Sequence, residues 1–227
     1  IMKKTMATRN YKLADAVLKQ KADEFLNLLD RDVEFADRGY NAAAKTQFIT
    51  ARDDAATQPS DEKLDAEKIG LTAAKDAARS ALEKTMRTIF NMAANRFGAQ
   101  SAQYRSFGNA EISRLPDAEL VRVSKIMMIA ATENLVEMTP EGLSQAMIDS
   151  LTQKSETFDT SIDDVAKGIS DRDIATEKRI ESLNALYALL TKYAGIGQDI
   201  FYEVNEAKYN DYVIYDTPDG LPEPPII

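Results

Sequence analysis

The sequence predicts an all-α fold, an elongated antiparallel bundle of five or six helices or two packed hairpin units, followed by an extended Pro-rich C-terminal tail. Two observations predict it. Only 7% of the 227 residues are aromatic and Trp is absent, so Ala, Leu, Ile and Met must form most of the core, which suits close-packed helices better than sheets. Apolar residues also recur at three- and four-residue intervals, as on the buried face of an amphipathic helix.

Residues 1–97 form the first predicted helical unit. Its helices span about residues 8–37, 42–57 and 61–97. Gly39 can adopt the left-handed turn that ends the first helix, and Asn41 can cap the second. Pro59 blocks continuation of the second helix, and the hydroxyl of Ser60 can accept from the exposed amides of the third.

A connector at residues 98–115 is predicted from its weak periodicity and two glycines, and it leads to a second helical unit at 116–209. Predicted helices span about residues 101–105 within the connector and 117–137, 140–166 and 171–209 in the second unit. Gly195 and Gly197 should weaken or bend the last helix. Residues 210–227 form the predicted tail, whose prolines favour extended polyproline geometry.

The formal charge of −9 argues against nucleic acid and against an anionic membrane surface as partners, because both attract basic proteins. No apolar stretch approaches the roughly 20 residues of a membrane-spanning helix, so a soluble protein is expected. The basic pair Lys3 and Lys4 is not followed by an apolar segment, and no signal peptide is expected in the chain as given. The compartment stays open, with the cytoplasm as the default.

The absence of His and Cys excludes Ser-His-Asp and Cys-His triads, His-bearing di-iron sites and Cys-ligated zinc. We therefore expect no enzyme, no cofactor and no metal, and predict no catalytic, cofactor-binding or metal-ligating residue. Asp30, Asp32, Asp163 and Asp164 are the carboxylates to test if the chain were a carboxylate-based enzyme. Arg or Lys alternates with these acids, which is more typical of a solvated helix face.

Six of the nine tyrosines lie from residue 187 onward, and this cluster is the strongest functional signal in the sequence. Tyrosine has an apolar body and a polar tip and is common at interfaces, so Tyr202, Tyr209 and Tyr212 are candidate ligand contacts. The alternative is that Tyr202 and Tyr209 pack the end of the bundle, while residues 211–216 cross it as an extended segment.

Four segments resemble a group of uncharacterised all-helical bacterial proteins with a K-D-A-A-R-x-x-L-E helix and a Pro-rich C-terminal extension. They are AAKDAARSALEKTMRTI (73–89), YRSFG (104–108), SRLPDAELVRV (113–123) and LTQKSETFDTSI (151–162). The resemblance implies tandem helical hairpins and no known activity, and it assigns no functional residue.

Three functions follow as hypotheses. The first is a non-catalytic structural or protein-interaction module that binds a protein partner or itself. The second is a ligand-binding module that uses the Tyr-rich C-terminal region, and the third, least favoured, is a carboxylate-based enzyme.

Overall fold

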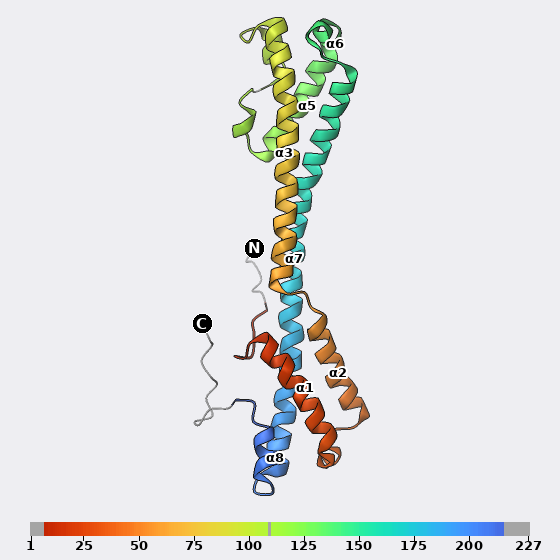
Figure 1. The fold of residues 1–227 in the computed structure, drawn as a ribbon, viewed down its shortest axis with the longest axis vertical. Helices are drawn as coiled ribbons and strands as arrows, with labels where there is room; N and C mark the ends of the chain where they lie inside the picture. The colour runs from red at the N-terminus through yellow and green to blue at the C-terminus, as the bar shows by residue number, and fades with distance from the viewer. Residues whose placement is uncertain (1–6, 109, 216–227) are drawn as a thin grey trace, which may run out of the picture. The chain divides into compact units, whose positions relative to one another are not determined.

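The computed structural model describes residues 7–108 and 110–215, and every regular element in them is a helix (Figure 1). This confirms the all-α prediction. The α-helices are α1 (Asp15–Arg31), α2 (Ala42–Thr57), α3 (Asp61–Phe97), α4 (Ala102–Arg105), α5 (Asp117–Glu133), α6 (Leu135–Met138), α7 (Gln145–Phe201) and α8 (Glu206–Asp211). Turns of 3-10 helix occur at Val33–Arg38, Ile112–Arg114 and Thr139–Glu141. The predicted extended tail is wrong at its start, because residues 210 and 211 belong to α8 and Tyr212 and Ile214 pack in the core of unit 1. Its Pro-rich part lies outside the described residues.

The chain divides into two compact units. Unit 1 combines residues 1–61 with 172–227, and unit 2 comprises residues 62–171. The predicted units were residues 1–97 and 116–209, so the observed boundaries, at residues 61 and 171, lie elsewhere. The N-terminal helices share their core with the C-terminal part of α7, and not with α3, so both ends of the chain belong to unit 1.

In unit 1, α1 and α2 pack against the part of α7 that follows residue 172 (Figure 1). Apolar side chains at three- and four-residue spacing on α1 are buried against α7, as the sequence pattern predicts. The rings of Phe48 on α2 and Tyr193 on α7 stack with their centroids 5.7 Å apart. Asn41 caps α2 by accepting a hydrogen bond from the Ala44 N–H at 3.0 Å. Gly39 has a φ of 90°, the left-handed turn that was predicted for it.

The first helix ends at Arg31, six residues earlier than predicted. Asp32 has extended backbone angles, and its side chain is fully buried, so the chain leaves the helix where this carboxylate turns inward. The following 3-10 turn, Val33–Arg38, then places Phe35 in the core of unit 1. A tertiary contact of Asp32 therefore sets the helix end.

Unit 2 is built from α3, α5 and the part of α7 that precedes residue 172. The segment predicted as a connector belongs to this unit, because Phe107 and Ile112 are buried in its core. A buried hydrogen bond of 2.7 Å joins the hydroxyls of Ser124 on α5 and Ser155 on α7. At the start of α5, Asp117 accepts hydrogen bonds from Lys75 and Arg79 of α3.

Helix α7 runs without a break from Gln145 to Phe201, although the sequence predicts two helices at 140–166 and 171–209. It also ends eight residues earlier than predicted, where the chain turns into α8. Gly168 lies between the two predicted helices. A Cβ atom there would come closer than 3.0 Å to the side chain of Leu71 on α3, so this glycine permits close helix packing within unit 2. A glycine in a helix can therefore reflect a neighbouring helix and not an end.

Candidate functional site

The structure separates the three candidate tyrosines. Tyr202 is 64% exposed, Tyr209 is half-buried, and Tyr212 is fully buried. The rings of Tyr202 and Tyr209 lie 6.2 Å apart and are tilted by 59°. Tyr212 instead packs among Phe25, Phe35 and Phe201 in the core of unit 1. Only two of the three tyrosines are therefore placed to contact a ligand at the surface.

Tyr202 and Tyr209 line a hollow of about 450 Å³ at the turn between α7 and α8. Glu203, Val204 and Glu206 line it as well. The helix α7 ends at Phe201, and Asn205 caps α8 by accepting a hydrogen bond from the Lys208 N–H at 3.0 Å. The hollow forms where the chain turns between α7 and α8. The four residues of this turn, 202–205, have exposed side chains.

The backbone of Glu203 adopts the left-handed conformation, with a φ of 57°. It is the only residue other than glycine with a positive φ among the described residues. This conformation places Cβ close to the following carbonyl oxygen and costs about 1–2 kcal/mol for most residues. An exposed side chain in a strained turn suggests a local role for its carboxylate.

Replacing Glu203 with glycine is expected to raise the free energy of unfolding by up to about 1 kcal/mol, because glycine adopts a positive φ without strain. Urea unfolding followed by circular dichroism measures the change. Glu206→Gly is the matched control, since Glu206 is helical and glycine there should lower stability by up to about 1 kcal/mol. If Glu203→Gly lowered the free energy of unfolding, the left-handed backbone of Glu203 would not be a source of strain.

An ionic cluster lies next to this turn and is centred on the buried carboxylate of Asp32. Arg31 donates two hydrogen bonds to its carboxylate, at 2.9 and 2.7 Å. The Tyr212 hydroxyl donates to Oδ2 at 2.8 Å, and Lys208 Nζ lies 2.9 Å from Oδ1. Burial by itself raises the pKa of Asp32, but the hydrogen bonds from Arg31, Lys208 and Tyr212 outweigh it and lower the pKa to about 2.

The same cluster shifts its other members. Burial, followed by the hydrogen bond to Asp32, raises the pKa of Tyr212 above its usual range. The hydrogen bond to Asp32 raises the pKa of Lys208 as well. Asp32 is therefore ionised at neutral pH, with both oxygens occupied by donors, and it acts as an anchor between α1 and α8.

The other candidate carboxylates are placed separately. Asp30 accepts from Lys45 Nζ at 2.7 Å with both oxygens, and Asp163 and Asp164 are exposed on the part of α7 that belongs to unit 2. In residues 7–108 and 110–215, no group of three or more acidic side chains is arranged to hold a metal ion. Each of Asp30 and Asp32 has a basic partner, as the alternation of acids with Arg and Lys predicted. The predicted solvated helix face is wrong for Asp32, which is fully buried beyond the end of α1, because its carboxylate turns inward to its donors.

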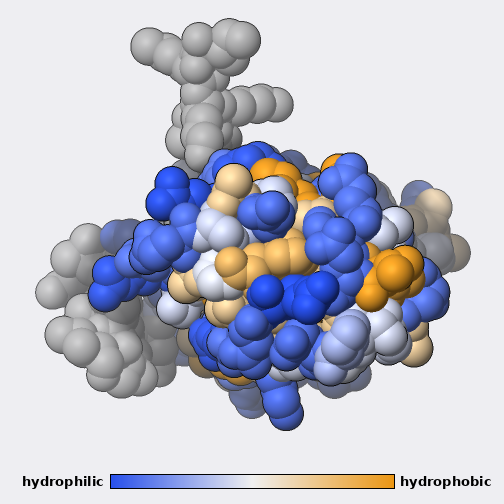
Figure 2. Space-filling view, turned by 90° about the horizontal axis from the view of Figure 1, so that it is seen from above, coloured by the Kyte–Doolittle hydropathy of each residue, from blue (hydrophilic) through white to orange (hydrophobic). Residues whose placement is uncertain are grey.

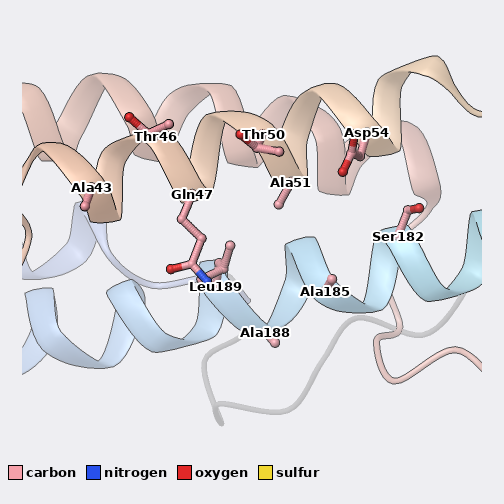
Figure 3. A pocket seen from close by; sticks show the side chains of 10 residues that line it. All are labelled: Ala43, Thr46, Gln47, Thr50, Ala51, Asp54, Ser182, Ala185, Ala188 and Leu189. Carbon is pink, nitrogen blue, oxygen red and sulfur yellow. The ribbon is translucent and has the colours of Figure 1, made fainter.

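A second surface feature of unit 1 is a groove of about 790 Å³ between α2 and α7 (Figure 3). Short side chains line both of its walls. On α2 they are Ala43, Thr46, Thr50, Ala51 and Asp54, with the longer Gln47, and on α7 they are Ser182, Ala185 and Ala188, with the larger Leu189. The two helices run in opposite directions, so Asp54 lies at the same end as Ser182, and Gln47 reaches toward Leu189.

Exposed apolar side chains elsewhere are dispersed. In unit 2 the large ones are Ile69, Ile129, Val136 and Ile169. The face drawn in Figure 2 is mainly hydrophilic, with hydrophobic residues in small separated patches. Scattered apolar residues of this kind are normal on protein surfaces. Among the helices that the structure describes, none has the length and apolar character needed to cross a bilayer.

No protein-family model, curated protein or solved structure matches this chain. The resemblance to helical bacterial proteins therefore stays a prediction. Any functional conclusion has to come from the hollow at the α7–α8 turn, the Asp32 cluster and the α2·α7 groove.

Proposed function

We propose that this chain is a non-catalytic helical module that associates with a second copy of itself through the α2·α7 groove of unit 1. The observation that carries the proposal is the pair of short-side-chain walls on two antiparallel helices (Figure 3). Small residues let helix backbones approach closely, and helices pack with their axes about 8–10 Å apart. A groove of this kind suits another helix better than a small polar ligand.

The lining is accessible and nearly uncharged. Ala43, Ala185 and Ala188 are exposed although they are apolar, and Asp54 is the only charged residue among those that line the groove. Helix α1 packs in the core of unit 1 with α2 and α7, and the groove remains open at their surface. Covering it with helices would remove apolar surface from water, which favours association.

The charges at one end of the groove favour a two-fold dimer. Ser182 lies at the end of the groove that Asp54 occupies on α2 (Figure 3). Lys178 precedes Ser182 by four residues, which is one helical turn along the same stripe of α7. Neither side chain makes an ion pair with another described residue. A two-fold axis along the groove places α2 against α7 of the second copy, so Asp54 faces Lys178 of that copy, and symmetry repeats the pair.

Light scattering at several concentrations tests the proposal, and we expect the measured mass to rise toward twice that of one chain. Ala185→Arg introduces a long charged side chain into the groove and should raise the dissociation constant of the dimer at least about tenfold. Ala56→Arg makes the same change at an exposed α2 position that does not line the groove, and it should leave the constant unchanged. A native chain that stays monomeric throughout contradicts the proposal.

A charge reversal tests the geometry of the dimer. Asp54→Lys and Lys178→Asp should each weaken association about three- to tenfold, because each creates two like-charge contacts. The double variant Asp54→Lys/Lys178→Asp restores opposite charges and should recover the native dissociation constant. Failure of the double variant to recover association would exclude this arrangement, even if the chain dimerises.

A further inference from the structure

We infer that the hollow at the α7–α8 turn binds a lysine or arginine side chain of a partner protein. This goes beyond the proposed self-association, because the hollow and the groove share no residue. The inference uses Tyr202 and Tyr209, two of the three tyrosines that the sequence indicates, and adds Glu203 and Glu206. It assigns the tyrosine pair a ligand class.

The aromatic pair supplies the first part of the argument. The rings of Tyr202 and Tyr209 are tilted by 59° with centroids 6.2 Å apart, so they form an open angle and not a closed stack. Tyr202 is 64% exposed, which leaves ring surface free. An ammonium or guanidinium group is attracted to the face of an aromatic ring at centroid distances up to about 6 Å, and tilted rings can share one cation.

The charges of the hollow supply the second part. Glu203 and Glu206 line it, and neither carboxylate has a hydrogen-bond or ion-pair partner among the described residues. Most other acids of unit 1 near this turn do have a basic partner, for example Asp32 with Arg31 and Asp199 with Arg38. Two carboxylates without a cation beside two tyrosine rings favour a positively charged group from outside.

Lys208 shows how this surface holds a cation. Its ammonium group lies 4.7 Å from the centroid of the Phe201 ring, 2.9 Å from Asp32 and 3.3 Å from Glu34. Phe201 also lines the hollow. An aromatic ring with two carboxylates therefore already binds a lysine of this chain, and the two tyrosines with Glu203 and Glu206 repeat the combination without an internal lysine.

The size of the hollow and the charge of the chain indicate a protein segment as the source of the cation. A volume of about 450 Å³ exceeds what one ammonium ion needs and accommodates a side chain with part of its backbone. The net charge of −9 also attracts a basic segment over a longer range than direct contact. The exposed side chain of Val204 offers an apolar contact for the methylene groups of lysine or arginine.

The test measures binding of a fluorescently labelled peptide of alternating lysine and serine residues by fluorescence polarisation at low salt. The matched peptide has norleucine in place of lysine, and we expect it not to bind. Tyr202→Leu should weaken binding of the lysine peptide about three- to tenfold, whereas Tyr202→Phe keeps a ring and should change it less than about twofold. Equal binding of both peptides would overturn the inference.

A second set of variants separates this site from the overall charge. Glu203→Gln/Glu206→Gln should weaken binding about three- to tenfold and reduce its salt dependence. Glu137→Gln removes an exposed carboxylate in unit 2 and should have no effect. If Glu137→Gln weakens binding as much as Glu203→Gln alone, attraction is non-specific and the inference fails. Ala185→Arg should leave peptide binding intact, so failure of self-association and failure of cation binding remain distinguishable.

Discussion

Replacing Asp32 with alanine is expected to lower the free energy of unfolding of unit 1 by about 3 kcal/mol. The carboxylate of Asp32 is fully buried and accepts hydrogen bonds from Arg31 and Tyr212, and Tyr212 is 180 residues away in the sequence. Without it, the buried Tyr212 hydroxyl loses its acceptor, and Arg31 and Lys208 each keep only their second carboxylate partner, Asp211 and Glu34. The effect exceeds that of an ordinary surface pair because removal leaves the fully buried Tyr212 hydroxyl without its acceptor.

Urea unfolding at pH 7 measures this loss, with Asp30→Ala as the control. Asp30 lies two residues earlier and pairs with Lys45, but half of its side chain is exposed, so its removal should cost less than about 1 kcal/mol. If the two variants lose the same stability, the Asp32 cluster contributes no more than a surface ion pair. Asp32→Asn gives a further comparison, since it keeps the size of the side chain and removes its charge.

The lowered pKa of Asp32 adds a pH dependence to the same prediction. The pKa is about 2 in the folded protein and about 3.9 in an unfolded chain. The stabilisation by this carboxylate is therefore complete well above pH 4 and is lost as the pH falls through about 4 toward 2. It amounts to about 2–3 kcal/mol. The stability difference between the native chain and Asp32→Asn should shrink over this interval, and a constant difference would contradict the assignment.

Local signals in the sequence were sufficient for some helix boundaries and not for others. The predicted bounds of α2 and α3 agree with the structure, because Asn41 caps the start of α2 and Pro59 cannot continue that helix. The end of α1 was predicted too late, since it depends on where Asp32 finds its partners. A break in α7 was predicted between residues 166 and 171, but the helix is continuous there, and Gly168 packs against Leu71, which is distant in sequence.

The same limit applies to the candidate site. Tyr202, Tyr209 and Tyr212 lie within eleven residues of one another, yet Tyr202 is exposed and Tyr212 is buried. Nothing in their local pattern distinguishes them, because the hydrogen-bond acceptor of Tyr212 is Asp32, which lies 180 residues earlier in the sequence. The α2·α7 groove was not predicted, although its small residues recur at helical spacing from Ala43 to Asp54. Small and polar residues at that spacing also occur on any solvated helix face.

The two glycines of α7 that the sequence indicated, Gly195 and Gly197, are expected to respond in opposite ways to alanine. A Cβ atom at Gly197 would lie closer than 3.0 Å to three atoms of the Tyr212 ring, a separation that real Cβ atoms essentially never show. The ring cannot move away easily, because its hydroxyl is bonded to Asp32 and its faces pack on Phe201 and Phe35. Gly197→Ala should therefore lower the free energy of unfolding by about 2 kcal/mol.

Gly195 is the matched control in the same helix, two residues earlier. It is exposed, and a Cβ atom there meets nothing within 4 Å, so alanine adds only helix propensity. Gly195→Ala should raise the free energy of unfolding by about 0.5–1 kcal/mol, measured by urea unfolding alongside Gly197→Ala. A stabilising effect of both substitutions would mean that Tyr212 does not sit against Gly197, and the packing of residues 212–215 onto α7 would then be contradicted. Opposite signs would show that the first part of the predicted tail belongs to the core of unit 1, since only a docked Tyr212 makes alanine costly at one glycine and favourable at the other.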